Sequence, residues 1–112
     1  MIGRTTLGFA TRGNTVIGVV ATNARLGKED VNKVAQMAHD GLARTIRPAH
    51  TMLDGDTIFA LATGKRKAEV NIVGAFAAEV IALAIVRAVR KAKPAGGLPA
   101  LSDVVDGENL GE

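Results

Sequence analysis

The sequence predicts an α/β fold built from two core strands and two helices. Two continuous apolar runs, of which the first is rich in β-branched residues, predict the strands, at residues 15–22 and 57–62. Each is followed by a longer segment with helical character, at residues 28–46 and 69–91. Because consecutive elements usually pack as neighbours, we expect both helices on one face of the strands.

Composition limits the chain to one domain and excludes several kinds of site. The 112 residues are 47% apolar, with 13 Gly, 3 Phe and neither Trp nor Tyr, so the core must consist of Ala, Val, Ile and Leu. The absence of Cys excludes a disulfide framework, a thiolate zinc site and a cysteine nucleophile. The two histidines, His39 and His50, cannot form a metal site unaided. We therefore expect no metal and no cofactor.

The positive charge raises the question of a nucleic-acid partner. The formal net charge is +3 and the pI is near 9.7, and Lys and Arg neutralise phosphates. Aromatic residues that stack on bases are nearly absent, however, and no nucleic-acid-binding motif is found. We expect no nucleic-acid partner. The first residues are too polar for a secretory signal, so we expect a cytoplasmic protein.

Thr15 stands at the start of the first strand, directly after Gly13 and Asn14. A chain that cuts itself before this threonine would leave Thr15 with a free α-amino group, which could act as its own base. Alternatively, Gly13 and Asn14 form an ordinary turn and Thr15 is an ordinary β-former. The apolar run that follows is typical of a strand buried on both faces.

The first helix has clear start and stop signals. Glu29 and Asp30 suit the positive N-terminal end of a helix, and Pro48 prevents its continuation. His39 lies beside the apolar face of this helix. It is interpreted as a packed or hydrogen-bonded residue rather than a catalyst.

An acidic pair, Asp54 and Asp56, precedes the second strand as Thr15 precedes the first. A calcium loop would need further oxygen ligands at regular spacing, and these are missing. Turn chemistry alone can explain Asp-Gly-Asp, and it predicts carboxylates that point to solvent or bond their own Gly55 and Thr57 amides. Alternatively, the two acids orient the ammonium group or the hydroxyl of Thr15. Both interpretations are open at this point.

The second helix is apolar nearly all round, which admits a membrane interpretation by length and composition. Glu79 and Arg87 are costly in lipid, and the Ala-rich composition suits close packing inside protein. We expect a helix buried between a sheet and a neighbouring subunit, and no membrane partner. The residues from Pro94 onward lack periodicity and predict a loose extension or a partner-dependent arm.

Three stretches together resemble a known family. They are Asn14-Thr15 with the strand that follows, residues 38–51, and residues 53–64 with the acidic pair. Over residues 14–64, the sequence is similar to the C-terminal part of the self-cleaving aminopeptidases and amidohydrolases. That family includes the D-esterase/L-aminopeptidases, the β-aminopeptidases and the nylon-oligomer hydrolase, with ornithine acetyltransferase as a distant relative.

The resemblance implies a layered αββα fold made of a larger α subunit and a small β subunit, cut from one precursor. Cleavage would fall between Asn14 and Thr15, Thr15 would be the nucleophile, and Asp54 and Asp56 match the acidic pair beside it. One departure is Val16, where members commonly have a second hydroxyl residue. On this basis residues 1–14 are the end of the α part, residues 15–93 a β-subunit-like domain and residues 94–112 a C-terminal tail.

The resemblance also implies an amide or peptide hydrolase that needs a partner. In the family the α part supplies most of the substrate pocket and the oxyanion donors, and such donors contribute a few kcal/mol in comparable hydrolases. We therefore expect an α-subunit-like chain or a homo-oligomer as partner, and a small amide or peptide as substrate. The alternative is a truncated, catalytically inactive relative that acts as an assembly or interaction module.

Overall fold

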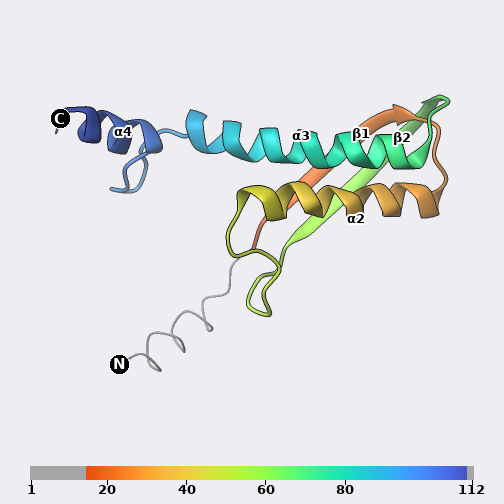
Figure 1. Ribbon diagram of the computed structural model, residues 1–112, viewed down its shortest axis with the longest axis horizontal. Helices are drawn as coiled ribbons and strands as arrows, with labels where there is room; N and C mark the ends of the chain where they lie inside the picture. The colour runs from red at the N-terminus through yellow and green to blue at the C-terminus, as the bar shows by residue number, and fades with distance from the viewer. Residues whose placement is uncertain (1–14, 111–112) are drawn as a thin grey trace.

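A computed structural model describes residues 15–110 of the chain. Its elements follow in the order β1 (Ile17–Ala24), α2 (Lys28–Thr45), β2 (Thr57–Arg66), α3 (Val70–Lys91) and α4 (Leu101–Leu110), as Figure 1 shows. The two predicted strands and two predicted helices are all present, with bounds that differ by a few residues. The predicted lead-in at residues 1–14 lies outside the described residues.

β1 and β2 form a two-stranded parallel sheet. Ile17 is paired with Thr57 and the register runs to Thr22 and Ala62, after which an irregularity interrupts the ladder. Since the strands are parallel, both begin at the same end of the sheet. The residues just before Ile17 and just before Thr57 therefore lie close together.

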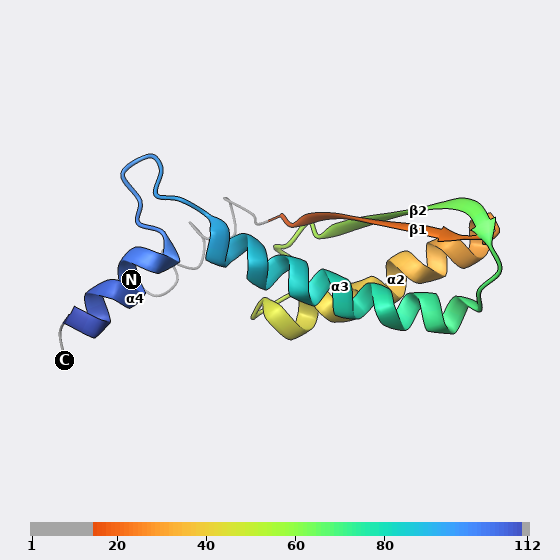
Figure 2. The same ribbon diagram turned by 90° about the horizontal axis from the view of Figure 1, so that it is seen from above.

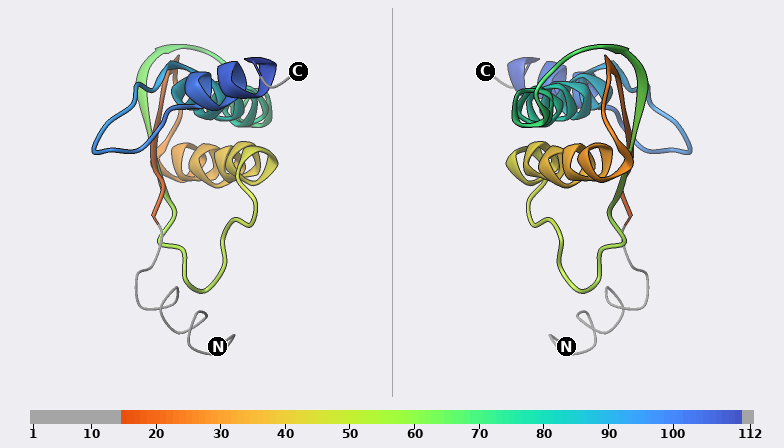
Figure 3. Two further views of the ribbon diagram at one scale, coloured as in Figure 1. Left: turned by 90° about the vertical axis from the view of Figure 1, so that its left-hand side faces the viewer. Right: turned by 90° about the vertical axis from the view of Figure 1, so that its right-hand side faces the viewer.

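Both helices cover the same face of this sheet, as predicted (Figures 2 and 3). α2 and α3 lie side by side beneath the strands, and the core forms where side chains of the sheet, of α2 and of α3 meet. The buried cluster consists of Val20, Val34, Ala38, Leu42, Ile58, Ala77 and Ile81. This mixed α/β arrangement confirms the predicted fold class.

Local sequence signals place α2 where it was expected. Gly27 caps the N-terminus in an extended conformation, and Glu29 and Asp30 lie in the first turn. At the other end the Thr45 hydroxyl donates to the Gly41 carbonyl at 2.9 Å. The helix ends at Thr45, so the loop that follows can carry Asp54 and Asp56 back to the start of the sheet.

The opposite face of the sheet is open. Ile17, Val19 and Phe59 are 69%, 60% and 59% exposed, and Leu61 is also exposed. The prediction of a first strand buried on both faces is therefore wrong for this chain. Both helices lie on one side of the sheet, and no described element covers the other side.

α3 is the only helix of the described residues that is long and apolar enough to cross a membrane, by length and composition alone. In the structure it packs against α2 through small residues, with Gly74, Ala77, Ala78 and Ile81 buried. Its outer side carries exposed apolar side chains, namely Ile72, Phe76, Val80 and Leu83. The helix is thus buried on one side only in this chain.

The C-terminal region holds a helix, α4, that the sequence pattern does not predict. A tight turn precedes it, in which Gly96 and Gly97 have φ values of 59° and 78°. The Leu98 amide donates to the Ala95 carbonyl across this turn at 2.9 Å. Asp103 Oδ2 then accepts from the Ala100 amide at 2.9 Å, which satisfies a free donor at the start of the helix. This local cap explains a helix where we expected a loose extension.

Candidate active site

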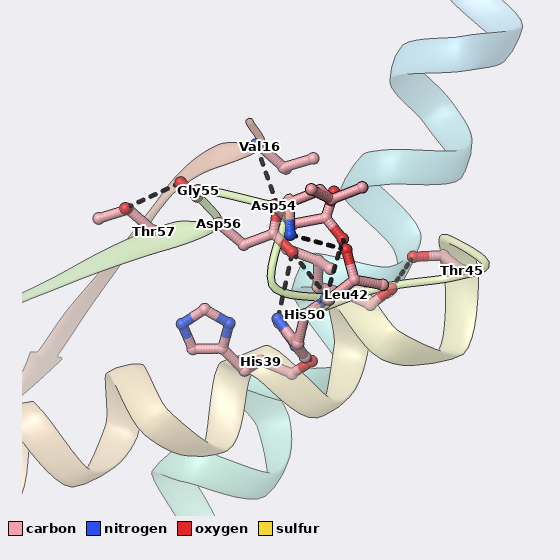
Figure 4. Close-up of polar contacts among 11 residues, drawn as sticks. Val16, His39, Leu42, Thr45, His50, Asp54, Gly55, Asp56 and Thr57 are labelled. Atoms are coloured by element: carbon pink, nitrogen blue, oxygen red, sulfur yellow. Dashed lines mark hydrogen bonds and ion pairs between the residues drawn. The ribbon is translucent and has the colours of Figure 1, made fainter. Parts of the chain in front are cut away.

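The parallel register brings the start of β1 next to the acidic loop that precedes β2. The Thr57 amide donates to the Val16 carbonyl at 2.8 Å. The Val16 amide in turn donates to Asp56 Oδ1 at 3.3 Å (Figure 4). The residue that follows Thr15 is therefore tied to one of the two predicted carboxylates.

Thr15, Asp54 and Asp56 line one pocket of about 560 Å³. Thr15 is an exposed residue, whereas Asp54 and Asp56 are half-buried residues. The other lining residues are Val16, Ile46, Arg47, Pro48, Thr51 and Leu53. The structure thus brings the three predicted catalytic residues together at the mouth of the sheet. Their catalytic roles stay predictions, and Asn14, the residue before the predicted cleavage point, lies outside the described residues.

Asp54 fixes the turn that precedes it. Its Oδ2 accepts from the Thr51 amide at 3.0 Å and from the Thr51 hydroxyl at 2.8 Å. The Asp54 amide donates back to the Thr51 carbonyl at 3.0 Å. This is local turn chemistry, but with Thr51 rather than with Gly55 and Thr57 as partners. Among residues 15–110, Oδ1 of Asp54 accepts no hydrogen bond from protein, so it can accept one from a ligand in the pocket.

Asp56 makes contacts that turn chemistry does not explain. Its side chain is only 5% exposed, and its Oδ2 accepts from the backbone amide of His50 and lies beside the His50 ring, both at 3.1 Å. Its Oδ1 reaches across to the Val16 amide. Asp56 therefore neither points to solvent nor bonds its own neighbours, and the turn-only interpretation is wrong for this residue.

His50 is the site residue that sequence reasoning missed. The two histidines are too few for a metal site, and the spacing of His50 from Asp56 fits no common motif, so no sequence pattern indicates its role. Its ring packs edge-on against the ring of His39, with centroids 4.8 Å apart and planes at 68°. His39 is therefore a packed helix residue, as predicted, and its buried Nδ1 has no partner among the described residues.

The pocket combines a hydroxyl residue and two carboxylates in one lining. A threonine with a free α-amino group carries both a hydroxyl and a base. Neighbouring carboxylates can hold an ammonium group and a hydroxyl in place. Within the part of the chain that the structure describes, no group of three or more His, Cys, Asp or Glu is placed to hold a metal ion.

Comparison with known proteins decides the family. The model of a family described as Peptidase family S58 matches residues 2–100. The chain belongs to peptidase family S58. This confirms the predicted membership of the self-cleaving aminopeptidase family.

Relatives of this S58 member carry two kinds of name. An uncharacterized aminopeptidase of Mycobacterium tuberculosis is 45% identical over 114 residues, covering 88% of this chain and 33% of the relative. A 6-aminohexanoate-oligomer endohydrolase of a Kocuria species is 33% identical over 91 residues, covering 70% of this chain and 26% of the relative. A 6-aminohexanoate-oligomer endohydrolase of Paenarthrobacter ureafaciens is 34% identical over 89 residues, covering 68% of this chain and 25% of the relative. The chain thus spans a third or less of these relatives.

Proposed function

We propose that this chain carries the nucleophile of an N-terminal-nucleophile threonine hydrolase that acts on amide or peptide bonds. The observation that carries the proposal is the pocket that Thr15 shares with Asp54 and Asp56, in a member of peptidase family S58. The chain cleaves itself between Asn14 and Thr15, and this cleavage frees the α-amino group of Thr15.

Catalysis then follows an acyl-transfer scheme. The Thr15 hydroxyl attacks the amide carbonyl of the substrate while the α-amino group takes the hydroxyl proton. The proton passes to the leaving amine, and an acyl-threonine remains, which water hydrolyses. Asp54 and Asp56 hold the ammonium group and the hydroxyl in place during both steps.

The names of the relatives support two substrate classes. The mycobacterial relative is named as an aminopeptidase, and the Kocuria relative is named for oligomers of 6-aminohexanoate. For this chain we propose small amides, the N-terminal residues of peptides, or ω-amino-acid oligomers. In all three, the reacting group is an unstrained amide, which needs both an activated nucleophile and oxyanion stabilisation.

A partner completes the site in this proposal. The exposed apolar side chains of the open sheet face and of the outer side of α3 support association, because exposed patches of this kind mark interfaces. The partner is an α-subunit-like chain or further copies of this chain, and the enzyme is cytoplasmic. The same patches favour the second candidate function, a catalytically inactive module for assembly.

Mass spectrometry of the purified chain tests the enzyme proposal. We expect a fragment that begins at Thr15 to accumulate during incubation, alone or with the α subunit of a related S58 enzyme. The mixture is then expected to release amine from peptide and ω-amino-acid amides. A chain that stays intact and inert towards both kinds of amide in either incubation would favour the assembly module instead.

Association is tested on the open face of the sheet. Val19 and Phe59 are register partners there, and both are largely exposed. We expect Val19→Lys to shift the chain from an oligomer to a monomer in sedimentation velocity at micromolar concentration, because burying an unpaired ammonium group at an interface is costly. Met52→Lys places the same charge on a fully exposed loop residue and is expected to leave association unchanged. A compact wild-type monomer under these conditions argues against further copies of this chain as the partner.

A further inference from the structure

His50 adopts a backbone conformation that its residue type disfavours. It lies in the loop between α2 and β2 with φ at 57°, in the left-handed region. Residues other than glycine rarely occupy this region, and they do so where the surrounding structure fixes them. The contacts of His50 should therefore identify what fixes this loop.

Both donors of His50 meet one oxygen of Asp56. The His50 amide donates to Asp56 Oδ2 at 3.1 Å, and the ring Nδ1 lies 3.1 Å from the same atom. This acceptor assigns the proton to Nδ1. Asp56 is almost fully buried, so water competes little for these bonds. The far side of the ring lies against α2, where Nε2 is 3.5 Å from the His39 carbonyl oxygen.

The bonds to His50 determine what Asp56 can offer to Thr15. An ionised carboxylate accepts about four hydrogen bonds. His50 occupies Oδ2 with two donors, and the Val16 amide occupies one position on Oδ1. Among residues 15–110, nothing occupies the remaining position on Oδ1, the atom that already contacts the residue next to Thr15 (Figure 4).

We propose that His50 is a positioning residue that holds Asp56 in place through Nδ1, so that Oδ1 stays against the start of β1 and beside Thr15. The inference rests on the proposed function of Thr15. It predicts that losing the ring donor slows the chemical step, while substrate affinity stays the same. The ring donor does not touch the substrate in this scheme.

Paired variants separate the ring donor from the backbone conformation. His50→Gly allows the left-handed conformation but removes the ring, whereas His50→Asn tolerates that conformation and returns an N–H donor near the position of Nδ1. We expect His50→Gly to lower kcat and the rate of self-cleavage by about 10- to 100-fold, the usual effect of removing an outer-shell partner, with KM within about twofold. His50→Asn should recover most of the loss.

His39→Phe is the matched control. It keeps an aromatic ring against His50 and removes the two ring nitrogens, of which the buried Nδ1 has no partner among the described residues, so kcat should stay within about twofold of the wild type. A His50→Gly enzyme with wild-type kcat would overturn the inference, and so would a His50→Asn enzyme as slow as His50→Gly.

Hydrogen exchange at the Val16 amide tests the positioning role of His50 without an activity assay. If the wild type proves inert, that result contradicts only the proposed function. We expect His50→Gly to speed hydrogen exchange at the Val16 amide by about tenfold or more, because Asp56, which accepts from this amide, is no longer held in place. We expect His50→Asn and His39→Phe to leave this exchange near the wild-type rate. The Thr57 amide, which donates to the Val16 carbonyl just before β1, is the internal reference. Unchanged Val16 exchange in His50→Gly overturns the positioning role.

Discussion

Thr15→Ala is expected to abolish both self-cleavage and amide hydrolysis. The substitution removes the hydroxyl that lines the pocket with Asp54 and Asp56 and leaves the backbone unchanged. Loss of a nucleophile lowers the rate of a hydrolase by several orders of magnitude, so we expect a fall of at least about 10³-fold. Intact-mass spectrometry over several days and an amine-release assay measure the two reactions.

Thr15→Ser is the matched variant, because it keeps the hydroxyl and the α-amino group and removes only a methyl group. We expect it to cleave and to hydrolyse amides at a rate within about tenfold of the wild type. Since Thr15 is exposed, neither variant should change the unfolding temperature noticeably. Release of a fragment starting at residue 15 from Thr15→Ala would refute the assignment of the nucleophile.

The sequence predicts the main elements because their patterns are long and consistent. The apolar run before residue 22 and the helical spacing after Lys28 each extend over several turns or pleats, and both elements form. α4 is different, because its start depends on one side chain, Asp103, which bonds the Ala100 amide after a two-glycine turn. A single cap of this kind gives no periodic signal.

The predicted burial of β1 fails for a physical reason. An apolar run such as residues 16–21 indicates a strand that is suited to burial on both faces. It does not indicate whether the same chain or another chain buries each face. Here α2 and α3 cover one face, and Val19 and Phe59 remain exposed on the other. The open face is what a layered αββα fold requires if a second sheet packs against it.

Only part of the candidate site could be predicted from the sequence. Asp54 and Asp56 stand out because two acids precede a strand and match a family pattern. His50 does not, since its role depends on a left-handed φ and on a loop that folds back from α2. Neither property follows from residue spacing, and both require the tertiary structure.

Two glycines allow α2 and α3 to approach closely, and they differ in what surrounds them. A Cβ atom added to Gly41 would overlap the backbone carbonyl oxygen of Ala78 and lie 3.0 Å from the Ala82 amide nitrogen. A Cβ atom added to Gly74 would meet mainly the side chain of Met37. Backbone atoms of a packed helix cannot move separately, whereas a methionine side chain can adopt another rotamer.

We therefore expect Gly41→Ala to lower the free energy of unfolding by about 2–3 kcal/mol, as overpacking does, even though alanine is a better helix former than glycine by about 1 kcal/mol. Gly74→Ala makes the same chemical change in the same interface, and the helix preference should offset most of the rearrangement of Met37, for a net effect below about 1 kcal/mol. Urea unfolding followed by circular dichroism at 222 nm measures both values. Equal losses in the two variants would mean that α3 moves away from α2 as a rigid body, and that the Gly41 contact does not set the helix separation.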